Sequence, residues 1–260
     1  MKRLVSFALF GTKPLYLQGA LRNVAMIPEI YPGWTPRIYV SQEIPEELVK
    51  QLIAGGAEVV RKHRTGEIDG MFWRFLPAGE TGIDAMVVRD VDSRPTRREY
   101  VAVQEWLASG KSLHIMRDHP HHKVVILGGM WGCRGNAIPD MEAMVDSWKL
   151  WAKKGQDQDF LRDAIYPRFK DDLLVHSDLY QYRGELVKPF PIPRERGEFV
   201  GAIIDPDRDS FTDAQADASE ALFAGCSFQQ LKRAKRRMKF SLVAEQWLRN
   251  LRRMLGRKSA

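Results

Sequence analysis

The sequence predicts an α/β fold, in which a mostly parallel sheet has helices on both faces. Strand-like apolar runs alternate with helix-like segments over the first 150 residues, and glycine or proline closes several of them. This alternation is typical of βαβ units, whose strands lie side by side in one sheet. Because 260 residues can bury a complete core, we expect one α/β domain over residues 1–206 and a helical extension over residues 207–260.

Six short aliphatic runs predict the strands, because aliphatic and β-branched side chains favour extended backbone. Gly11 follows the first run, and Gly55 and Gly56 precede the third, where they indicate turns. In chain order, the predicted strands are residues 4–10, 37–40, 57–61, 85–89, 113–116 and 124–127.

Apolar residues at spacings of three and four predict the helices. Pro28 closes the first helix, because proline lacks a backbone N–H and clashes with the preceding turn. Pro45 lies near the first turn of the second helix, where proline is tolerated. Residues 71–76 are expected to be helical or irregular. In chain order, the predicted helices are residues 17–26, 45–54, 96–107, 139–151, 213–223 and 231–255.

Composition excludes several classes of protein. A hydrophobic content of 44% with 10% aromatic residues indicates a folded chain, not a disordered one. Cys133 and Cys226 are too few for a disulfide framework or a zinc knuckle, so we expect a reducing cytosol. The apolar N-terminal run is short for a signal peptide, and no run approaches the roughly 20 apolar residues of a membrane span. We therefore expect a cytoplasmic protein that does not cross a membrane.

Positive charge is concentrated in residues 231–258. This segment holds eleven lysines and arginines against one acidic residue, Glu245, for a net charge of +10, whereas the whole chain carries +7. Apolar residues at helical spacing in this segment, together with Trp247, favour binding to an anionic membrane surface. The alternative is that the segment forms a helix packed on the domain. Nucleic acid is the least favoured partner, because aromatic residues are sparse and no nucleic-acid-binding motif occurs.

Two carboxylates one residue apart follow the strand predicted over residues 85–89. Asp90 and Asp92 would lie at the carboxyl edge of the sheet, where ligands bind in open α/β folds. Their oxygens suit Mg²⁺ or Mn²⁺ held together with the phosphates of a substrate. Without a cation the two charges repel each other. The alternative is a solvated turn that Ser93 and Pro95 complete.

Short motifs follow one another in order between residues 70 and 191. They are residues 71–77 (MFWRFLP), 90–93 (DVDS), 127–132 (LGGMWG), 155–161 (GQDQDFL), His176 and 188–190 (KPF). Together they resemble the motifs of GT-A fold glycosyltransferases, and most closely those of glycosyltransferase family 8, the group of glycogenin and the bacterial lipopolysaccharide glucosyl- and galactosyltransferases. Leu127 or Gly128 stands where that family has Asn, Phe190 replaces a Trp, and the spacing from His176 to Lys188 is longer. We therefore expect a divergent relative.

The resemblance implies a retaining, metal-dependent enzyme that moves a sugar from a nucleotide-diphosphate sugar to a glycan or lipid-linked acceptor. A divalent ion on Asp90 and Asp92 would neutralise the charge that develops on the leaving nucleoside diphosphate. His176 would complete the metal's ligands, and Lys188 would lie on the β-phosphate. Further candidates for contacts with the donor's phosphates or sugar are Arg74, Asp90, Arg94, Arg117 and Asp118.

Asp157, Gln158 and Asp159 are the catalytic candidates. Asp157 and Gln158 would line the sugar pocket near the anomeric carbon. If the enzyme inverts configuration, Asp157 or Asp159 would be the general base. These acidic residues are also typical of the first turn of a helix, and one side chain can serve both purposes.

The histidine-rich run 114–122 suggests a zinc site, but Pro120 prevents a helical face that would present two histidines together. We favour a loop at the same sheet edge, in which Arg117 and Asp118 contact the donor sugar or form a structural ion pair.

Two other functions are weighed against glycosyl transfer. A nucleotidyltransferase acting on sugar phosphates also uses a carboxylate-bound metal, but it normally carries a longer glycine-rich loop than Gly11 to Pro14 offers. A non-catalytic adaptor for membrane or nucleic acid would fit the basic segment, but the ordered motifs argue against a degenerate scaffold.

Overall fold

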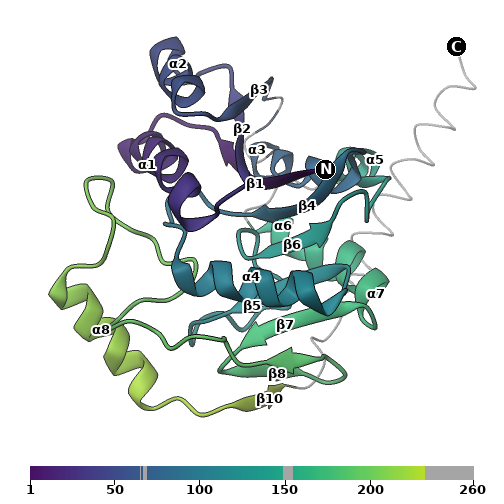
Figure 1. Cartoon of the computed structure of the whole chain (residues 1–260), viewed down its shortest axis with the longest axis vertical. Coiled ribbons are helices and arrows are strands. Elements are labelled where there is room, and N and C mark those ends of the chain that lie inside the picture. The colour runs from purple at the N-terminus through teal and green to yellow at the C-terminus, as the bar shows by residue number, and fades with distance from the viewer. Residues whose placement is uncertain (65, 67–68, 149–154, 232–260) are drawn as a thin grey trace, which may run out of the picture.

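The computed structural model describes residues 1–64, 66, 69–148 and 155–231, which form an eight-stranded sheet with helices on both faces (Figure 1). The strand order is β3-β2-β1-β4-β6-β5-β7-β9, and β6 alone runs antiparallel to its neighbours in this described part. The predicted fold class is confirmed. The strands of this sheet are β1 (Lys2–Leu9), β2 (Thr35–Ser41), β3 (Glu58–Lys62), β4 (Ile83–Val88), β5 (Leu113–Arg117), β6 (Trp131–Arg134), β7 (Leu173–Ser177) and β9 (Val187–Lys188). A second, two-stranded sheet pairs β8 (Tyr180–Tyr182) with β10 (Gln229–Leu231) in parallel.

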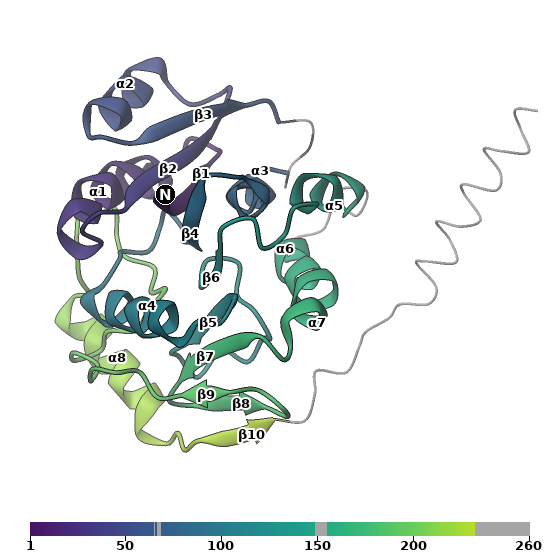
Figure 2. The same ribbon diagram turned by 45° about the vertical axis from the view of Figure 1, so that its right-hand side comes forward.

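Helices cover the large sheet in two groups, which Figure 2 shows on opposite sides of the strands. The first group packs through Val24, Leu52 and Trp106. It consists of α1 (Pro14–Ile30), α2 (Glu46–Ala54) and α4 (Arg97–Ser109). The second group packs through Phe72 and Phe160. It consists of α3 (Gly70–Trp73), the 3-10 turn η1 (Leu76–Gly79), α5 (Met141–Trp148), α6 (Gln156–Phe160), the π-helical turn η2 (Leu161–Ile165) and α7 (Tyr166–Phe169).

Several element boundaries differ from the sequence prediction. Residues 124–127 form no strand; Arg117 donates to the Val124 and Val125 carbonyls, so a side chain satisfies backbone groups that a strand would pair. Helix α1 continues two residues beyond Pro28. The sequence did not predict β6, β7, β8 or β9. The predicted helix over 231–255 and the end of that over 139–151 lie outside the described residues.

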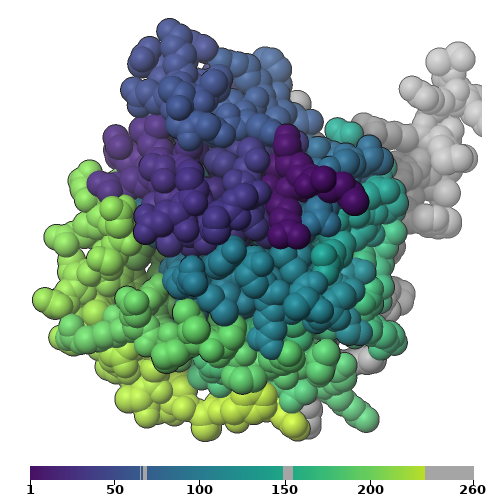
Figure 3. All heavy atoms as spheres, in the orientation of Figure 1, coloured from purple at the N-terminus to yellow at the C-terminus, as the bar shows by residue number. Residues whose placement is uncertain are grey.

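The segment after β9 returns across the sheet to α1. There α8 (Asp213–Ala224) begins with a capping box between Thr212 and Gln215, and Arg22 of α1 binds Asp209 at 2.7 Å. The green and yellow residues of this region cover the lower left of the face shown in Figure 3. A domain boundary at residue 206 stays a prediction. In the described part of the chain, no helix is long and apolar enough to cross a membrane.

Candidate active site

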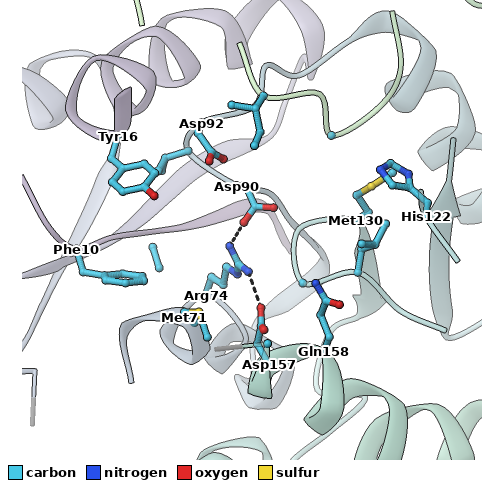
Figure 4. Close-up of a pocket in the computed structure, with 17 residues that line it drawn as sticks. Phe10, Tyr16, Met71, Arg74, Asp90, Asp92, His122, Met130, Asp157 and Gln158 are labelled. Atoms are coloured by element: carbon cyan, nitrogen blue, oxygen red, sulfur yellow. Dashed lines mark hydrogen bonds and ion pairs between the residues drawn. The ribbon is translucent and has the colours of Figure 1, made fainter. Parts of the chain in front are cut away.

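A cavity of about 440 Å³ opens at the carboxyl ends of β1 and β4 (Figure 4). Parallel strands β1 and β4 are neighbours, and the loops that follow them supply Phe10 and Asp90. The β5–β6 loop, the start of α6 and residues 201–203 complete the lining. The cavity therefore lies where the neighbouring loops of an α/β sheet diverge, the usual place for a ligand.

A tight turn after β4 places Asp90 and Asp92 in this cavity. The Ser93 hydroxyl donates to the Asp90 carbonyl at 3.0 Å. The Asn23 amide of α1 donates to the Val91 carbonyl at 3.2 Å, and the Ile204 N–H donates to the Asp92 carbonyl at 2.9 Å. The backbone of the Asp-Val-Asp turn is thus held from two directions, which is more order than a solvated turn requires.

Arg74 directly follows α3, and its side chain lies between two carboxylates in the cavity. Its guanidinium pairs with Asp90 and, at 3.2 Å, with Asp157 at the start of α6, as Figure 4 shows. Only 9% of the Arg74 side chain is exposed, and its pair with Asp157 is buried, whereas the Asp90 carboxylate is half-exposed. Asp92 is a third carboxylate in the same cavity, and no described residue forms an ion pair with it. Three acidic groups therefore surround one basic group.

Burial raises the pKa of two carboxyl groups in the cavity. Burial, and after it the charge of Asp90, raises the pKa of Asp92 to about 6. Burial also raises the pKa of Asp157, against the lowering effect of Arg74. Both shifts show that burial penalises the ionised carboxylates, and the charge of Asp90 adds to this effect.

Two glycines of the β5–β6 loop make room for this cluster. A Cβ on Gly129 would lie 2.1 Å from the Asp90 carboxylate, and one on Gly128 would lie 2.3 Å from that of Asp157. Both distances are far below van der Waals contact. The absence of side chains at these positions therefore permits the arrangement of Arg74 between the two carboxylates.

The donor set fits a divalent cation. Hard carboxylate oxygens are the ligands that Mg²⁺ and Mn²⁺ prefer, and the Asp92 carboxylate lines the cavity without an ion pair to a described side chain. The described residues hold no group of three or more acidic, histidine or cysteine side chains already arranged around a metal position. Asp90 and Asp92 would therefore bind a metal with further oxygens supplied by a substrate's phosphates.

The structure does not bring His176 and Lys188 to this cavity. His176 lies on β7, three strands from β4, a separation of about 14 Å at the usual strand spacing. Its Nδ1 contacts His114 Nε2 at 2.8 Å and its Nε2 contacts Glu105 at 3.1 Å, so both ring nitrogens are engaged. Lys188 pairs with the same Glu105 carboxylate. These two residues do not complete a metal site with Asp90 and Asp92 here.

Arg117 and Asp118 are also held in structural pairs outside the cavity. Arg117 binds both oxygens of Glu185 at 2.8 Å, and both side chains are almost wholly buried. Asp118 receives two hydrogen bonds of 2.9 Å from Arg98. Of the two predictions made for these residues, the structure shows the ion pairs, and neither residue lines the cavity.

Arg94 and Asp159 likewise do not line the cavity. Arg94 donates to the carbonyls of Asp205 and Arg208 and so fastens the segment after β9. Asp159 pairs with Arg162 at 2.5 Å one turn along the same helix. Among the predicted site residues, the cavity therefore gathers Arg74, Asp90, Asp92, Asp157 and Gln158.

Sequence reasoning missed several lining residues. Phe10 and Tyr16 form one wall, and His122 and Met130 lie on the other side (Figure 4). Ile203 also lines the cavity. Phe10 was counted only as the end of a strand, although an aromatic residue at a strand's carboxyl end is a signal that could have been used. Nothing local in the sequence marks Ile203, because its place depends on the return of a distant segment.

No family model matches the sequence, and no characterised protein is significantly similar to it. Three solved structures illustrate the structural likeness. A glycosyltransferase involved in glycosylation of the major capsid of PBCV-1 has a TM-score of 0.47 at 14% identity, over 70% of this chain and 85% of that one. The 4-diphosphocytidyl-2C-methyl-D-erythritol synthase of Anaerococcus prevotii has a TM-score of 0.46 at 10% identity, over 86% and 96%. An active-site mutant of LgtC has a TM-score of 0.43 at 13% identity, over 88% and 97%. Because each TM-score is below 0.5, we infer function from the residues of the cavity.

Proposed function

We propose that this protein is a metal-dependent glycosyltransferase that uses a nucleotide-diphosphate sugar as its donor. The observation that carries the proposal is the cavity with three carboxylates, Asp90, Asp92 and Asp157, around the single guanidinium of Arg74. A divalent cation supplies the missing positive charge, and a diphosphate supplies the missing oxygens.

The lining suggests how a donor would lie. The aromatic wall of Phe10 and Tyr16 suits a nucleobase, since flat rings stack with favourable contact area. The diphosphate would then lie at Asp90 and Asp92, and the sugar would point towards Asp157 and Gln158 on the start of α6.

The reaction breaks the bond between the anomeric carbon and the phosphate oxygen and forms one to an acceptor hydroxyl. Negative charge develops on the leaving diphosphate, where a metal acts as a Lewis acid when bound. Arg74 is buried and fixed by two carboxylates, so it adds a positive charge that needs no reorganisation. The resemblance to family 8 supports retention of anomeric configuration, which NMR of the first-formed product would decide.

A thermal-shift screen tests the proposal. UDP-, GDP-, CDP- and dTDP-sugars are each added with and without Mn²⁺ to the wild type, to Asp92→Asn and to Asp159→Asn. A donor at a hundredfold excess over its Kd should stabilise the wild type by about 2.7 kcal/mol. Asp92→Asn should lose the Mn²⁺-dependent part, whereas Asp159→Asn should keep it, because Asp159 is a nearby carboxylate outside the cavity.

If none of the nucleotide sugars changes the melting temperature of the wild type, donor binding is contradicted. A shift that is equal with and without Mn²⁺, and equal in Asp92→Asn, would contradict the metal site. If the protein instead makes a nucleotide sugar from a sugar phosphate and a nucleoside triphosphate, it is a nucleotidyltransferase.

We further propose a cytoplasmic protein that binds the inner face of a membrane through residues 231–258, which suits a lipid-linked acceptor. The net charge of +10 of this segment supports electrostatic attraction to anionic lipid. Co-sedimentation with phosphatidylcholine vesicles, with and without phosphatidylserine, would test this proposal. Equal recovery of the protein with both kinds of vesicle would contradict it.

A further inference from the structure

The β5–β6 loop carries a histidine into the cavity on a tightly fixed backbone. Tyr180 Oη donates to the Pro120 carbonyl at 2.6 Å, and Tyr182 Oη donates to that of Lys123 at 3.0 Å. The His122 N–H donates to the His119 carbonyl at 2.8 Å. Because these hydrogen bonds hold the loop on both sides of His122, they fix the position of its backbone.

The His122 ring is fixed as well. Its Nδ1 accepts the Asp118 backbone N–H at 3.2 Å, and Asp118 is itself anchored by Arg98. The ring also packs near His119 and Phe199, with centroid distances of 5.5 and 5.7 Å. These contacts define the direction in which the free edge of the ring points.

The same hydrogen bond decides the protonation of the ring. A backbone N–H can only donate, so Nδ1 must carry the lone pair, and the neutral ring has its proton on Nε2. Burial, and after it the neighbouring His119 and His121, lowers the pKa of His122 to about 3. No described residue accepts a hydrogen bond from Nε2. At neutral pH, His122 is therefore an uncharged donor with one N–H to offer.

The surroundings of this N–H suit a sugar. His122 and Met130 lie across the cavity from Phe10 and Tyr16, with the Asp90–Arg74–Asp157 cluster between the two walls (Figure 4). Met130 adds apolar surface on the same side, and Ile203, a residue that is 60% exposed, adds more to the lining of the cavity. A sugar ring presents both an apolar face and hydroxyls, and it can use both kinds of surface.

We propose that His122 orients the acceptor of the transferase reaction, by donating its Nε2–H to a hydroxyl of a neutral sugar that packs against Met130 and Ile203. The inference rests on the proposed function, because it places the acceptor opposite the nucleobase wall. His122 contacts the substrate but does not exchange a proton with it.

A pair of amide substitutions tests this role. In His122→Gln the amide nitrogen lies at about the reach of Nε2, whereas in His122→Asn it lies at about that of Nδ1. His121→Asn, at the exposed neighbour, is the matched control. The donor identified by the thermal-shift screen is used with methyl glycosides of glucose, galactose and mannose as acceptors, and its hydrolysis by water is measured separately.

His122→Asn should raise the KM for the methyl glycoside by about three- to tenfold, the effect of losing one hydrogen bond between neutral groups. His122→Gln should restore most of it. The Kd of the donor and its rate of hydrolysis should not change. In the wild type with ¹⁵N-labelled histidine, the His122 Nε2–H resonance should shift on addition of the methyl glycoside and not on addition of the nucleoside diphosphate alone, a readout that needs no variant to fold.

Three results would overturn the inference. One is an unchanged KM in His122→Asn; another is a donor Kd that rises as much as the acceptor KM. The third is donor hydrolysis by the wild type without transfer to any methyl glycoside. Failure of the proposed function is distinguishable, because then no nucleotide sugar would bind at all.

Discussion

The carboxyl ends of β4 and β5 carry similar polar sequences but have opposite roles. After β4, Asp90 and Asp92 face a cavity with too little positive charge around them. At the end of β5, Arg117 binds Glu185 through two hydrogen bonds and is fully buried. The comparison teaches that charge balance, more than position at a sheet edge, separates a binding group from a structural one.

The β5 end should respond most strongly to mutation. Arg117→Ala would leave the buried Glu185 carboxylate without its partner, which should lower the free energy of unfolding by about 3–5 kcal/mol. Urea denaturation followed by circular dichroism measures the change. The double variant Arg117→Met with Glu185→Leu removes both charges and should recover most of the loss. A single variant as stable as the wild type would contradict a structural role.

Mutation at the carboxyl end of β4 should instead weaken donor binding more than it lowers the stability of the fold. Gly129→Ala places a methyl group against the Asp90 carboxylate, which is half-exposed and can turn away. We expect donor affinity in the presence of Mn²⁺ to fall by about tenfold or more, equivalent to about 1.4 kcal/mol, measured by calorimetric titration. Gly225→Ala is the control, because its Cβ would meet no atom within 4 Å. Unchanged affinity in Gly129→Ala would sink the assignment of Asp90 as a ligand.

Acid should have a smaller, graded effect at the β4 end. The pKa of Asp92 is raised to about 6, so below that pH the folded protein binds a proton that the unfolded chain binds only near its ordinary value of 3.8. This group therefore makes the fold more stable as the pH falls from 6 towards 4, and less stable as the pH rises through 6.

Metal binding should have the opposite dependence, because protons and Mn²⁺ compete for the same oxygens. We expect Mn²⁺-dependent donor affinity to fall by up to about tenfold per pH unit below pH 6, for one competing proton. Titrations at pH 7, 6 and 5 measure it. The residual affinity of Asp92→Asn should vary less over this range, and equal dependence in both proteins would contradict the assignment to Asp92.

The fold was largely predictable because its signals are local. Apolar runs marked β1 to β5, and the helix predicted over residues 96–107 corresponds to α4, in which the hydroxyl of the N-cap Thr96 accepts the Glu99 N–H. The antiparallel strand β6 was missed because its four residues, Trp131–Arg134, include Gly132 and do not form an aliphatic run. The strands β8 and β9 have only three and two residues, so no local periodicity could reveal them.

The site was predictable only where one strand end supplies it. Asp90 and Asp92 were found because they follow a buried run, and Asp157 because it belongs to a compact motif. His176 was misplaced, since a histidine inside β7 can bind either a metal or a neighbouring side chain, and His114 lies within 2.8 Å of it. Only the tertiary structure decides between such partners.

The hydrogen bonds between the turn after β4 and the segment after β9 also affect when the protein can fold during its synthesis. Arg94 binds the Asp205 carbonyl across 111 residues of chain, and the Ile204 N–H binds Asp92. At about 5–20 residues per second, a ribosome needs roughly 5 to 20 s to add that length. Asp90 and Asp92 thus leave the ribosome well before the backbone that frames them, and the nascent chain acquires the finished cavity only near the end of translation of the folded region.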